Sequence, residues 1–298
     1  MVATPTSSLA MAPTANPDLE AGPVTVCPAV GGQTHAMLVS SPHSGRDYQT
    51  GFAGQTHLDV AILRRSEDAY VDRIIRDVPD FGIPTIMANF PRVFVDVNRA
   101  PGELDPAMYS DRVRLSVDRD SRRTASGLGV IPRISADGRQ LYGRRLKFAE
   151  AERRLDSCYW PYHNRLRAMI DETRDRFGAA LLLDVHSMPH QSSRGADIVI
   201  GDRFGRSSGA AICDIVEHQF RAQGFVTVRN TPYAGGFTTE SYGRPESGVH
   251  VVQIEVNRSL YLDEGRVSPT EGLDRFSGEF SNFISAIRES LTPYLRLS

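Results

Sequence analysis

Three apolar stretches of this sequence each end at a residue that can titrate, and this feature constrains the fold more than any other. The stretches are AMLVSSPHSG at His43, AALLLDVHSM at His186 and HVVQIEVNR at Glu255. Short apolar runs rich in β-branched residues are typical of strands buried on both faces of a sheet. Helical patterns alternate with them, over residues 207–222 and 270–291 among others. This order predicts an α/β fold, a three-layer mixed sheet flanked by helices, with chemistry beyond the carboxyl ends of the strands.

Further elements are expected between these stretches. Ser66 is predicted to cap a helix that buries Tyr70, Ile74 and Val78 at four-residue spacing. PTIMANF and RVFVDVNR are two more short β-rich runs, and a long amphipathic helix pattern covers residues 146–177. Strands and helices therefore alternate along most of the chain.

The length of 298 residues is consistent with one large α/β domain. Residues 1–22 are rich in Pro, Ala, Thr and Ser and predict a flexible N-terminal tail, which leaves residues 23–298 for a single catalytic domain. Residues 100–140 carry many Arg and Asp without a sustained period. A long excursion of this kind commonly forms a lid or one wall of a site, and we expect the same here.

The composition excludes several functions. The 34 basic and 36 acidic side chains give a net charge of −2, which offers no overall field to hold nucleic acid or an anionic membrane. Lys147 is the single lysine, so neither a P-loop lysine nor Schiff-base chemistry is expected. No apolar run is long enough to span a bilayer, and the N-terminus lacks the pattern of a signal peptide. We therefore expect a small-molecule substrate, with no nucleic acid or membrane partner.

Cysteine usage agrees with a cytoplasmic protein. Cys27, Cys158 and Cys213 are odd in number and widely spaced, without a CxxC pair. This pattern predicts neither a disulfide framework nor a thiolate zinc site, and it fits a reducing compartment.

The polar residues at the predicted strand ends have the chemistry of metal ligands. Two histidines and a carboxylate are the protein ligands of many catalytic zinc sites, with a fourth position open for water. His43 and His186 are the histidine candidates, and the acidic ligand stays open among Asp47, Glu67 and Asp68. The alternative is that each residue is an ordinary hydrogen-bonded group at a strand end, and that a carboxylate in a first helical turn only stabilises the helix.

RVFVDVNRAP places several polar side chains beside another predicted strand end. They are Arg92, Asp96, Asn98 and Arg99. An arginine is suited to bidentate capture of a carboxylate, although a chain rich in arginine also places many on its surface.

Two other classes of function remain open. Ser41, Ser44 and Ser187 lie next to the histidines, so a serine or cysteine hydrolase is one alternative, but the sequence has no GxSxG elbow. A metal-free binding protein or pseudoenzyme, which keeps the pocket and its arginines without turnover, is the other.

The order of the motifs SPHSG, SEDAYVD, PRVFVDVNRAP, WPYHNRL, LLLDVHSMP, DIVIGDRFGRSS, YAGGFTTESYG and VQIEVNRSLYLDE resembles the N-formylglutamate amidohydrolase (N-formylglutamate deformylase) family, from about residue 36 to the end. The resemblance implies a fold similar to the zinc carboxypeptidases and aspartoacylases. It also implies a Zn²⁺ ion held by two histidines and one acidic residue, and a Glu near the end of a late strand that serves as base. The positions that match the family's functional residues are His43, Asp68 and His186 as ligands, Glu255 as the catalytic Glu, and Asn98 with Arg99 as the carboxylate-binding pair.

One position departs from the wider pattern. Zinc carboxypeptidases place their acidic ligand three residues after the first His, and this chain has Arg46 there. The assignment of Asp68 therefore depends on the narrower family. Members of such families also act on other N-acyl amino acids, so N-formyl-L-glutamate is the first expectation and another small amide is the alternative.

The resemblance implies a hydrolytic mechanism in which Glu255 moves protons and Arg92 holds the developing oxyanion. Arg99 is the first expected partner for a substrate carboxylate, with Arg194 or Arg258 for the second. Asp184 lies two residues before His186 on the same predicted strand, where it can orient that ligand or form a core hydrogen bond.

Overall fold

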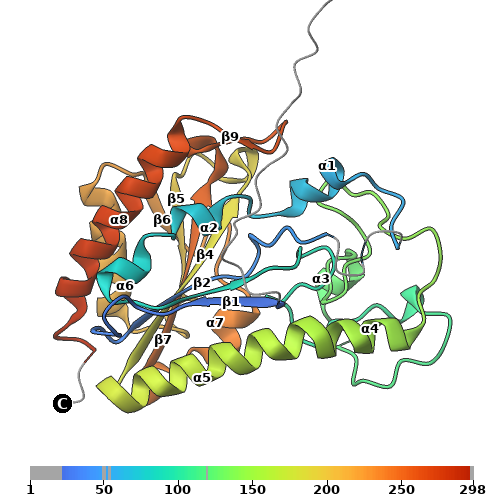
Figure 1. Cartoon of the computed structure of the whole chain (residues 1–298), viewed down its shortest axis with the longest axis horizontal. Coiled ribbons are helices and arrows are strands. Elements are labelled where there is room, and N and C mark those ends of the chain that lie inside the picture. Colours follow the sequence, from blue (N-terminus) through green and yellow to red (C-terminus); the bar gives the residue numbers. More distant parts are fainter. Residues whose placement is uncertain (1–21, 49–51, 53–54, 119, 296–298) are drawn as a thin grey trace, which may run out of the picture.

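The computed structural model describes residues 22–48, 52, 55–118 and 120–295, so all of the predicted N-terminal tail except Gly22 lies outside the described residues. At its centre is a seven-stranded mixed sheet with the order β1-β3-β2-β4-β7-β5-β6 (Figure 1). Neighbouring strands are parallel from β3 through β2 and β4 to β7, while β1 and β5 run antiparallel to their inner neighbours. The strands of this sheet are β1 (Val24–Cys27), β2 (Met37–Ser41), β3 (Thr85–Ala88), β4 (Ala180–Met188), β5 (Ile198–Gly201), β6 (Thr227–Arg229) and β7 (Val249–Asn257), and a separate pair is formed by β8 (Leu262–Asp263) and β9 (Ser268–Pro269).

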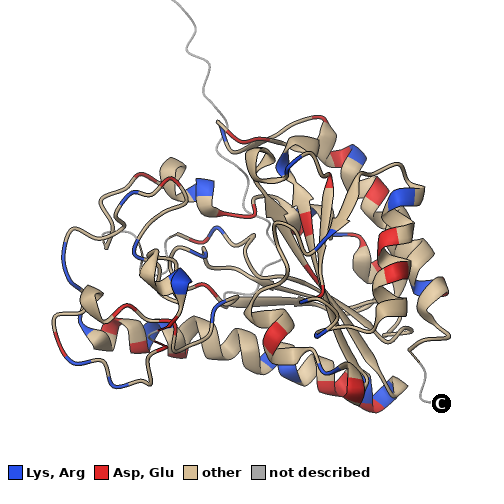
Figure 2. Cartoon of the chain, turned by 180° about the vertical axis from the view of Figure 1, so that it is seen from behind, with Lys and Arg blue, Asp and Glu red and all other residues tan. Residues whose placement is uncertain are grey.

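Helices cover both faces of this sheet, which confirms the predicted three-layer α/β fold. One face carries α2, α6 and α8, and the other carries α5 and α7 (Figure 1). No helix in the described part of the chain is both long enough and apolar enough to cross a membrane. Acidic and basic residues both occur along the helices (Figure 2). The helices are α1 (Val60–Leu63), α2 (Val71–Ile74), α3 (Arg122–Ala125), α4 (Phe148–Arg154), α5 (Trp160–Phe177), α6 (Ala210–Ala222), α7 (Phe237–Tyr242) and α8 (Gly272–Leu291).

Alternation along β4 decides which way its polar residues point. Leu183 and Val185 pack in the apolar cluster under α2, α6 and α8, whereas Leu182 packs in the cluster on the α5 side. Successive side chains of a strand face opposite sides of the sheet. Asp184 and His186 follow Leu182 at two-residue intervals, so both point to the α5 side. The two apolar clusters thus orient the polar end of β4.

The same alternation applies to β7, the parallel neighbour of β4. Ile254 belongs to the cluster under α8 and Val251 to the cluster on the α5 side. Gln253 and Glu255 therefore share the face of Val251, and Glu255 lies directly beside His186 in the strand register. The predicted convergence of strand ends is confirmed for this pair.

The predicted helix after Ser66 begins later and is shorter than expected. Its first helical residue follows Tyr70, which has a left-handed backbone (φ 64°) that interrupts helical geometry. The Ser66 hydroxyl accepts a hydrogen bond from the backbone N–H of Ala136 at 2.9 Å, so its predicted role as a cap was wrong. The predicted apolar face is correct, because Tyr70, Ile74 and Val78 are all buried.

RVFVDVNR was predicted as a β-rich run, but residues 92–99 form consecutive turns rather than a strand. Val93, Val95 and Val97 are buried in the apolar cluster on the α5 side, so their alternation reflects packing and not pairing within the sheet. The backbone N–H of Asp96 donates instead to the carbonyl oxygen of Val130, at 2.9 Å. This segment is therefore a loop between the sheet and the 100–140 excursion.

The long helix predicted over residues 146–177 is present in two parts, α4 and α5. One π-helical turn, Leu155–Tyr159, joins them without a break. The excursion over residues 100–140 contains one short 3₁₀ turn, Pro106–Met108, and α3 as its described helical segments, as its irregular sequence indicated.

His163, in the WPYHNRL motif, fixes the 92–99 loop against α5. Its ring Nε2 donates to the carbonyl oxygen of Val97 at 2.9 Å, since a carbonyl can only accept. Nδ1 is then the acceptor for the Tyr242 hydroxyl, 2.8 Å away. Burial lowers the pKa of His163 to about 4, so the ring is neutral at physiological pH.

This burial predicts a pH dependence of stability. Through His163, the free energy of unfolding should fall by about 3 kcal/mol as the pH drops from about 6.5, where the unfolded chain takes up the proton, to about 4. Above pH 6.5 both states are neutral and the contribution is flat. His163→Gln removes the titration, so its urea midpoint should vary less with pH over this range than that of the wild type. Equal slopes for the two proteins would contradict the prediction.

Candidate metal and catalytic site

The site lies at the carboxyl ends of three neighbouring parallel strands. His43 follows the end of β2 by two residues. His186 lies two residues before the end of β4, and Glu255 is its register partner on β7. The strand predictions were slightly short, because β4 and β7 each continue two residues beyond these side chains. All three side chains are buried.

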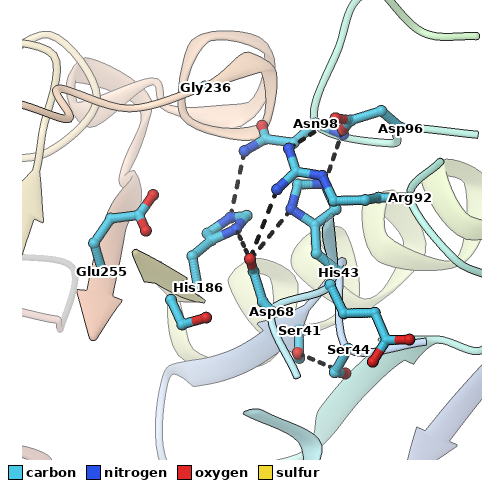
Figure 3. A network of polar contacts seen from close by, with 12 residues as sticks. Ser41, His43, Ser44, Asp68, Arg92, Asp96, Asn98, His186, Gly236 and Glu255 are labelled. Carbon is cyan, nitrogen blue, oxygen red and sulfur yellow. Dashed lines mark hydrogen bonds and ion pairs between the residues drawn. The ribbon is translucent and has the colours of Figure 1, made fainter. Parts of the chain in front are cut away.

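Asp68 reaches the site from the turn before α2. Its backbone N–H donates to the carbonyl oxygen of His43 at 3.0 Å, which places the two residues side by side. The Arg258 guanidinium donates to Asp68 Oδ1 at 3.2 Å and to the backbone oxygen of Glu67 at 2.5 Å. The other oxygen, Oδ2, lies 2.9 Å from His186 Nδ1 and 3.3 Å from His43 Nδ1 (Figure 3). One carboxylate oxygen therefore faces the same nitrogen of both rings.

A second carboxylate holds the far nitrogen of each histidine. His43 Nε2 lies 2.8 Å from Asp96 Oδ1, and His186 Nε2 lies 3.0 Å from Asp184 Oδ2. The Ser40 hydroxyl in turn donates to Asp184 Oδ1 at 2.6 Å. Each Nε2 faces a carboxylate, to which it can only donate, so Nδ1 of a neutral ring is the nitrogen left with a lone pair for a cation between the ring and Asp68. This is the arrangement that fixes the tautomer of a histidine ligand.

The three inner atoms fit a metal ion. His43, Asp68 and His186 offer one ligand atom each, and these atoms lie within 4.8 Å of one another. His43 Nδ1 is buried and makes no hydrogen bond within the described residues, an orphan that a cation would satisfy. The cluster could therefore hold a metal ion with two nitrogen ligands and one oxygen ligand, as predicted.

The electrostatics also favour a cation. Burial opposes ionisation of Asp68 and Asp96, yet charges and hydrogen bonds from neighbours such as His43 and Arg92 hold the pKa of both carboxyls well below the usual range. Burial alone would lower the pKa of His186, but the Asp184 carboxylate outweighs it and raises that pKa well above its ordinary value. The carboxylates that raise the pKa of His186 would also favour a metal cation between the two rings.

The structure distinguishes among the three acidic candidates. Asp68 is the one whose carboxylate meets both histidines. Glu67 is buried but points away, accepting from the Tyr48 hydroxyl at 2.6 Å. Asp47 is exposed, and its backbone N–H donates to the carbonyl oxygen of Asn89. The geometry agrees with the expectation for Asp68, which lies in a turn rather than in the first turn of a helix.

Glu255 has the environment of a proton carrier. Burial raises its pKa to about 7, because removal from water disfavours the charged form more than the nearby charge of His186 favours it. Its Oε1 accepts a hydrogen bond from Gln253 Nε2 at 2.9 Å. A carboxyl group with a pKa near neutrality can both accept and return a proton.

Arg92 lies beside the cluster and is half-buried. Its Nη2 donates to Asp96 Oδ2 at 2.9 Å, and its Nη1 lies 3.6 Å from Asp68 Oδ1. These carboxylates raise the pKa of Arg92 despite its burial. The guanidinium is thus a fixed positive charge at the edge of the site.

Asn98 and Arg99, the predicted carboxylate-binding pair, already make hydrogen bonds to other groups of the protein. Asn98 Oδ1 accepts from the backbone N–H of Thr238 at 2.9 Å, and Nδ2 lies 3.3 Å from His186 Nε2. Arg99 donates from Nε to the carbonyl oxygen of Leu128 and from Nη1 to that of Asn98. Burial lowers the pKa of Arg99, and the nearby charge of Arg92 lowers it further although Asp96 opposes both. Arg99 is therefore held by neutral oxygens, close to a second cation.

The two remaining arginine candidates differ in placement. Arg258 is buried, and besides its bonds to Asp68 and Glu67 it donates from Nε to the Ser187 hydroxyl at 3.0 Å. Its donors hold Asp68 in place, and its contact with a substrate stays a prediction. Arg194 is exposed, with a left-handed backbone (φ 54°) after β4.

The sequence analysis did not single out Gln253, and it placed Asp96 only beside a strand end, as a possible partner of Arg99 and not of His43. Gln253 could have been found, because it lies two residues before Glu255 and a strand places such residues on one face. The role of Asp96 had no local signal, since it depends on a contact with His43, 53 residues away in the chain.

This fold and this site define a class of α/β proteins in which two histidines and one carboxylate can hold a metal ion beside a buried glutamate at the carboxyl ends of parallel strands. The N-formylglutamate amidohydrolase family model matches residues 35–262. The chain belongs to the N-formylglutamate amidohydrolase family, and the resemblance seen in the sequence is confirmed.

Individual proteins agree with this assignment. The N-formylglutamate deformylase of Pseudomonas aeruginosa is 31% identical over 236 residues, which cover 76% of this chain and 82% of that protein. The N-formylglutamate deformylase of Pseudomonas putida is 26% identical over 236 residues, which again cover 76% of this chain and 82% of that protein. The crystal structure of N-formylglutamate amidohydrolase from Ralstonia eutropha JMP134 has a TM-score of 0.86 and 31% identity, covering 92% of this chain and 99% of that chain.

Proposed function

We propose that this protein is a zinc-dependent amidohydrolase that converts N-formyl-L-glutamate and water to L-glutamate and formate. The observation that carries the proposal is the meeting of His43 Nδ1, His186 Nδ1 and Asp68 Oδ2 beside the buried Glu255 carboxylate. The names of the relatives in Pseudomonas and Ralstonia support N-formylglutamate as the substrate.

The proposed metal ligands are His43, Asp68 and His186. When bound there, Zn²⁺ supplies a Lewis acid and lowers the pKa of a coordinated water toward about 7. Asp96 and Asp184 keep the two imidazoles in the tautomer that presents Nδ1 to the ion.

Glu255 is the proposed proton carrier. It accepts a proton from the water whose oxygen bonds to the formyl carbon, and it returns that proton to the amide nitrogen as the C–N bond breaks. Its pKa is about 7 in the metal-free site, and because a bound cation lowers this value, Glu255 is deprotonated and ready to accept the proton at neutral pH. The amine of glutamate leaves, and the formyl carbon departs as formate.

Arg92 is proposed to stabilise the oxygen of the formyl group as negative charge develops on it. Its guanidinium is already ordered by Asp96 and Asp68, so little reorganisation is needed during the reaction.

Arg99 remains the proposed partner for a substrate carboxylate. Its Nε and Nη1 are held by carbonyl oxygens, which fixes the plane of the guanidinium, and within the described residues Nη2 is left for a ligand. The neighbouring charges of Arg92 and Arg123 disfavour the cation at this place, and an anionic substrate would compensate for them. Arg194 stays a proposal for the second carboxylate, whereas the bonds of Arg258 to Asp68 favour a bracing role.

This assignment predicts a selective effect of Arg99→Lys. A lysine cannot reproduce the planar fork, so kcat/KM for N-formylglutamate should fall by about 10-fold or more, while an analogue with a neutral amide in place of the bound carboxylate should lose little. The measurement is kcat/KM for both substrates with each enzyme. Equal losses for the two substrates together with a lower melting temperature would show that Arg99 only braces the loop.

The proposed function is tested by zinc content and product formation on the same purified protein. One zinc per chain, with formate released fastest from N-formylglutamate among N-formyl and N-acyl amino acids, is the expected result. Faster release of another acid would keep the amidohydrolase and change its substrate. A protein without zinc that binds these compounds and releases no product would favour a metal-free binding protein instead.

A further inference from the structure

Gln253 connects the proposed base to a loop on the other side of the site. Its Nε2 donates to Glu255 Oε1 at 2.9 Å. Its Oε1 accepts from the backbone N–H of Gly236 at 3.0 Å and from Asn98 Nδ2 at 3.4 Å. Gln253 is buried, and it lies on the same face of β7 as Glu255. The side chain thus has a partner for each end of its amide.

These partners determine the orientation of the Gln253 amide. The Gly236 N–H can only donate, so it requires the oxygen of the amide on its side. Asn98 presents its nitrogen to the same oxygen, because Asn98 Oδ1 is already bound to the Thr238 N–H at 2.9 Å. The nitrogen of Gln253 must therefore face Glu255. A glutamate at position 253 would keep the acceptor and lose this donor.

Gly236 shows how closely the loop approaches. A Cβ atom at this position would lie 2.4 Å from the Asn98 side chain, a distance that real Cβ atoms do not adopt. The absence of a side chain lets the backbone N–H come within hydrogen-bond distance of Gln253. The backbone N–H of Gly236 and the side chain of Asn98 therefore hold the Gln253 amide, which in turn bonds the Glu255 carboxylate.

The terminal torsion of a glutamate has broad preferences, so a buried carboxylate needs a partner to hold one orientation. We propose that Gln253 is a positioning residue, which holds Oε1 of Glu255 and thereby presents Oε2 to the water and to the departing amine. This inference rests on the proposed function, in which Glu255 is the proton carrier. It assigns to Gln253 a contribution to kcat that acts through Glu255 and not through the metal ligands.

The test begins with Gln253→Met, which keeps similar volume, and Gln253→Glu, which keeps the acceptor. Both remove the donor to Glu255. We expect kcat for N-formylglutamate to fall by about 10- to 100-fold, the cost of a misplaced catalytic group, with KM within about twofold of the wild type. Zinc content should stay at the wild-type level. Gln219→Met in α6, which removes a side-chain hydrogen bond of 3.3 Å to Ser290 in α8, is the matched control and should leave kcat unchanged.

A double-mutant cycle with Glu255→Gln separates positioning from a general structural effect. If Gln253 acts through Glu255, Gln253→Met in the Glu255→Gln background should cause no further loss of kcat. Losses that multiply would overturn the inference, and so would wild-type kcat in both Gln253 variants or loss of zinc from both. Failure of the proposed function gives a different result: Glu255→Gln alone would then retain wild-type kcat, or no amide would be hydrolysed.

Discussion

Replacement of His43 or His186 by Ala should remove the metal and the activity together. Each ring supplies one of three inner ligand atoms, and the buried cavity left by Ala offers no substitute nitrogen. Zinc per chain, measured after dialysis against a metal-free buffer, should fall from one toward zero, and formate release should fall to the background rate. Circular dichroism of both variants checks that the sheet is intact.

The acidic ligand is tested by comparing Asp68→Ala with Asp47→Ala. Asp68 Oδ2 faces both histidines, so its loss should weaken metal binding far more than loss of the exposed Asp47. Stoichiometric zinc in both histidine variants would refute the site, and loss of zinc in Asp47→Ala alone would transfer the acidic ligand to that residue.

The second large effect is expected for Glu255→Gln. The amide cannot carry the proton, so kcat should fall by roughly 10²- to 10⁴-fold while the metal and the fold are retained. Zinc content and melting temperature provide the controls. A variant with unchanged kcat would place the base elsewhere.

The pH profile gives an independent check on Glu255. The base must be deprotonated to accept a proton, so kcat/KM should rise with pH through the pKa of Glu255. That pKa is about 7 in the metal-free site, and a bound cation lowers it, so the acidic limb should lie at or below pH 7. Glu255→Gln should abolish this limb in its residual activity.

Local patterns in the sequence predicted the strands that carry the site and the faces to which their side chains point. Apolar runs ending at His43, His186 and Glu255 identified three strand ends, because burial on both faces of a sheet selects such runs. Alternation along each strand then fixed which residues share a face, and this also holds for Gln253, whose relation to Glu255 is a spacing of two. These predictions succeed because they depend on neighbours within a few residues.

Other features were decided by contacts between distant segments. Asp68 and His186 are 118 positions apart and meet through Asp68 Oδ2, and nothing in the spacing separates Asp68 from Asp47 or Glu67. The same holds for Asp96, which looked like part of a strand but lies in a loop that holds a histidine ring. Arg258 was predicted as one possible substrate contact, and its hydrogen bond to Asp68, 190 positions away, had no signal in the sequence.

The physical reason is that the spacing of apolar residues is a local property, whereas the orientation of a side chain in the site depends on distant segments. The period of apolar residues follows from the geometry of one strand or helix, so the sequence by itself determined the layers, the strand ends and the residue types of the site. Which ring nitrogen faces which oxygen depends on how loops return to the sheet and which donors they bring. Only the tertiary structure decided that Nδ1 of both histidines turns inward to Asp68 while Asp96 and Asp184 hold Nε2.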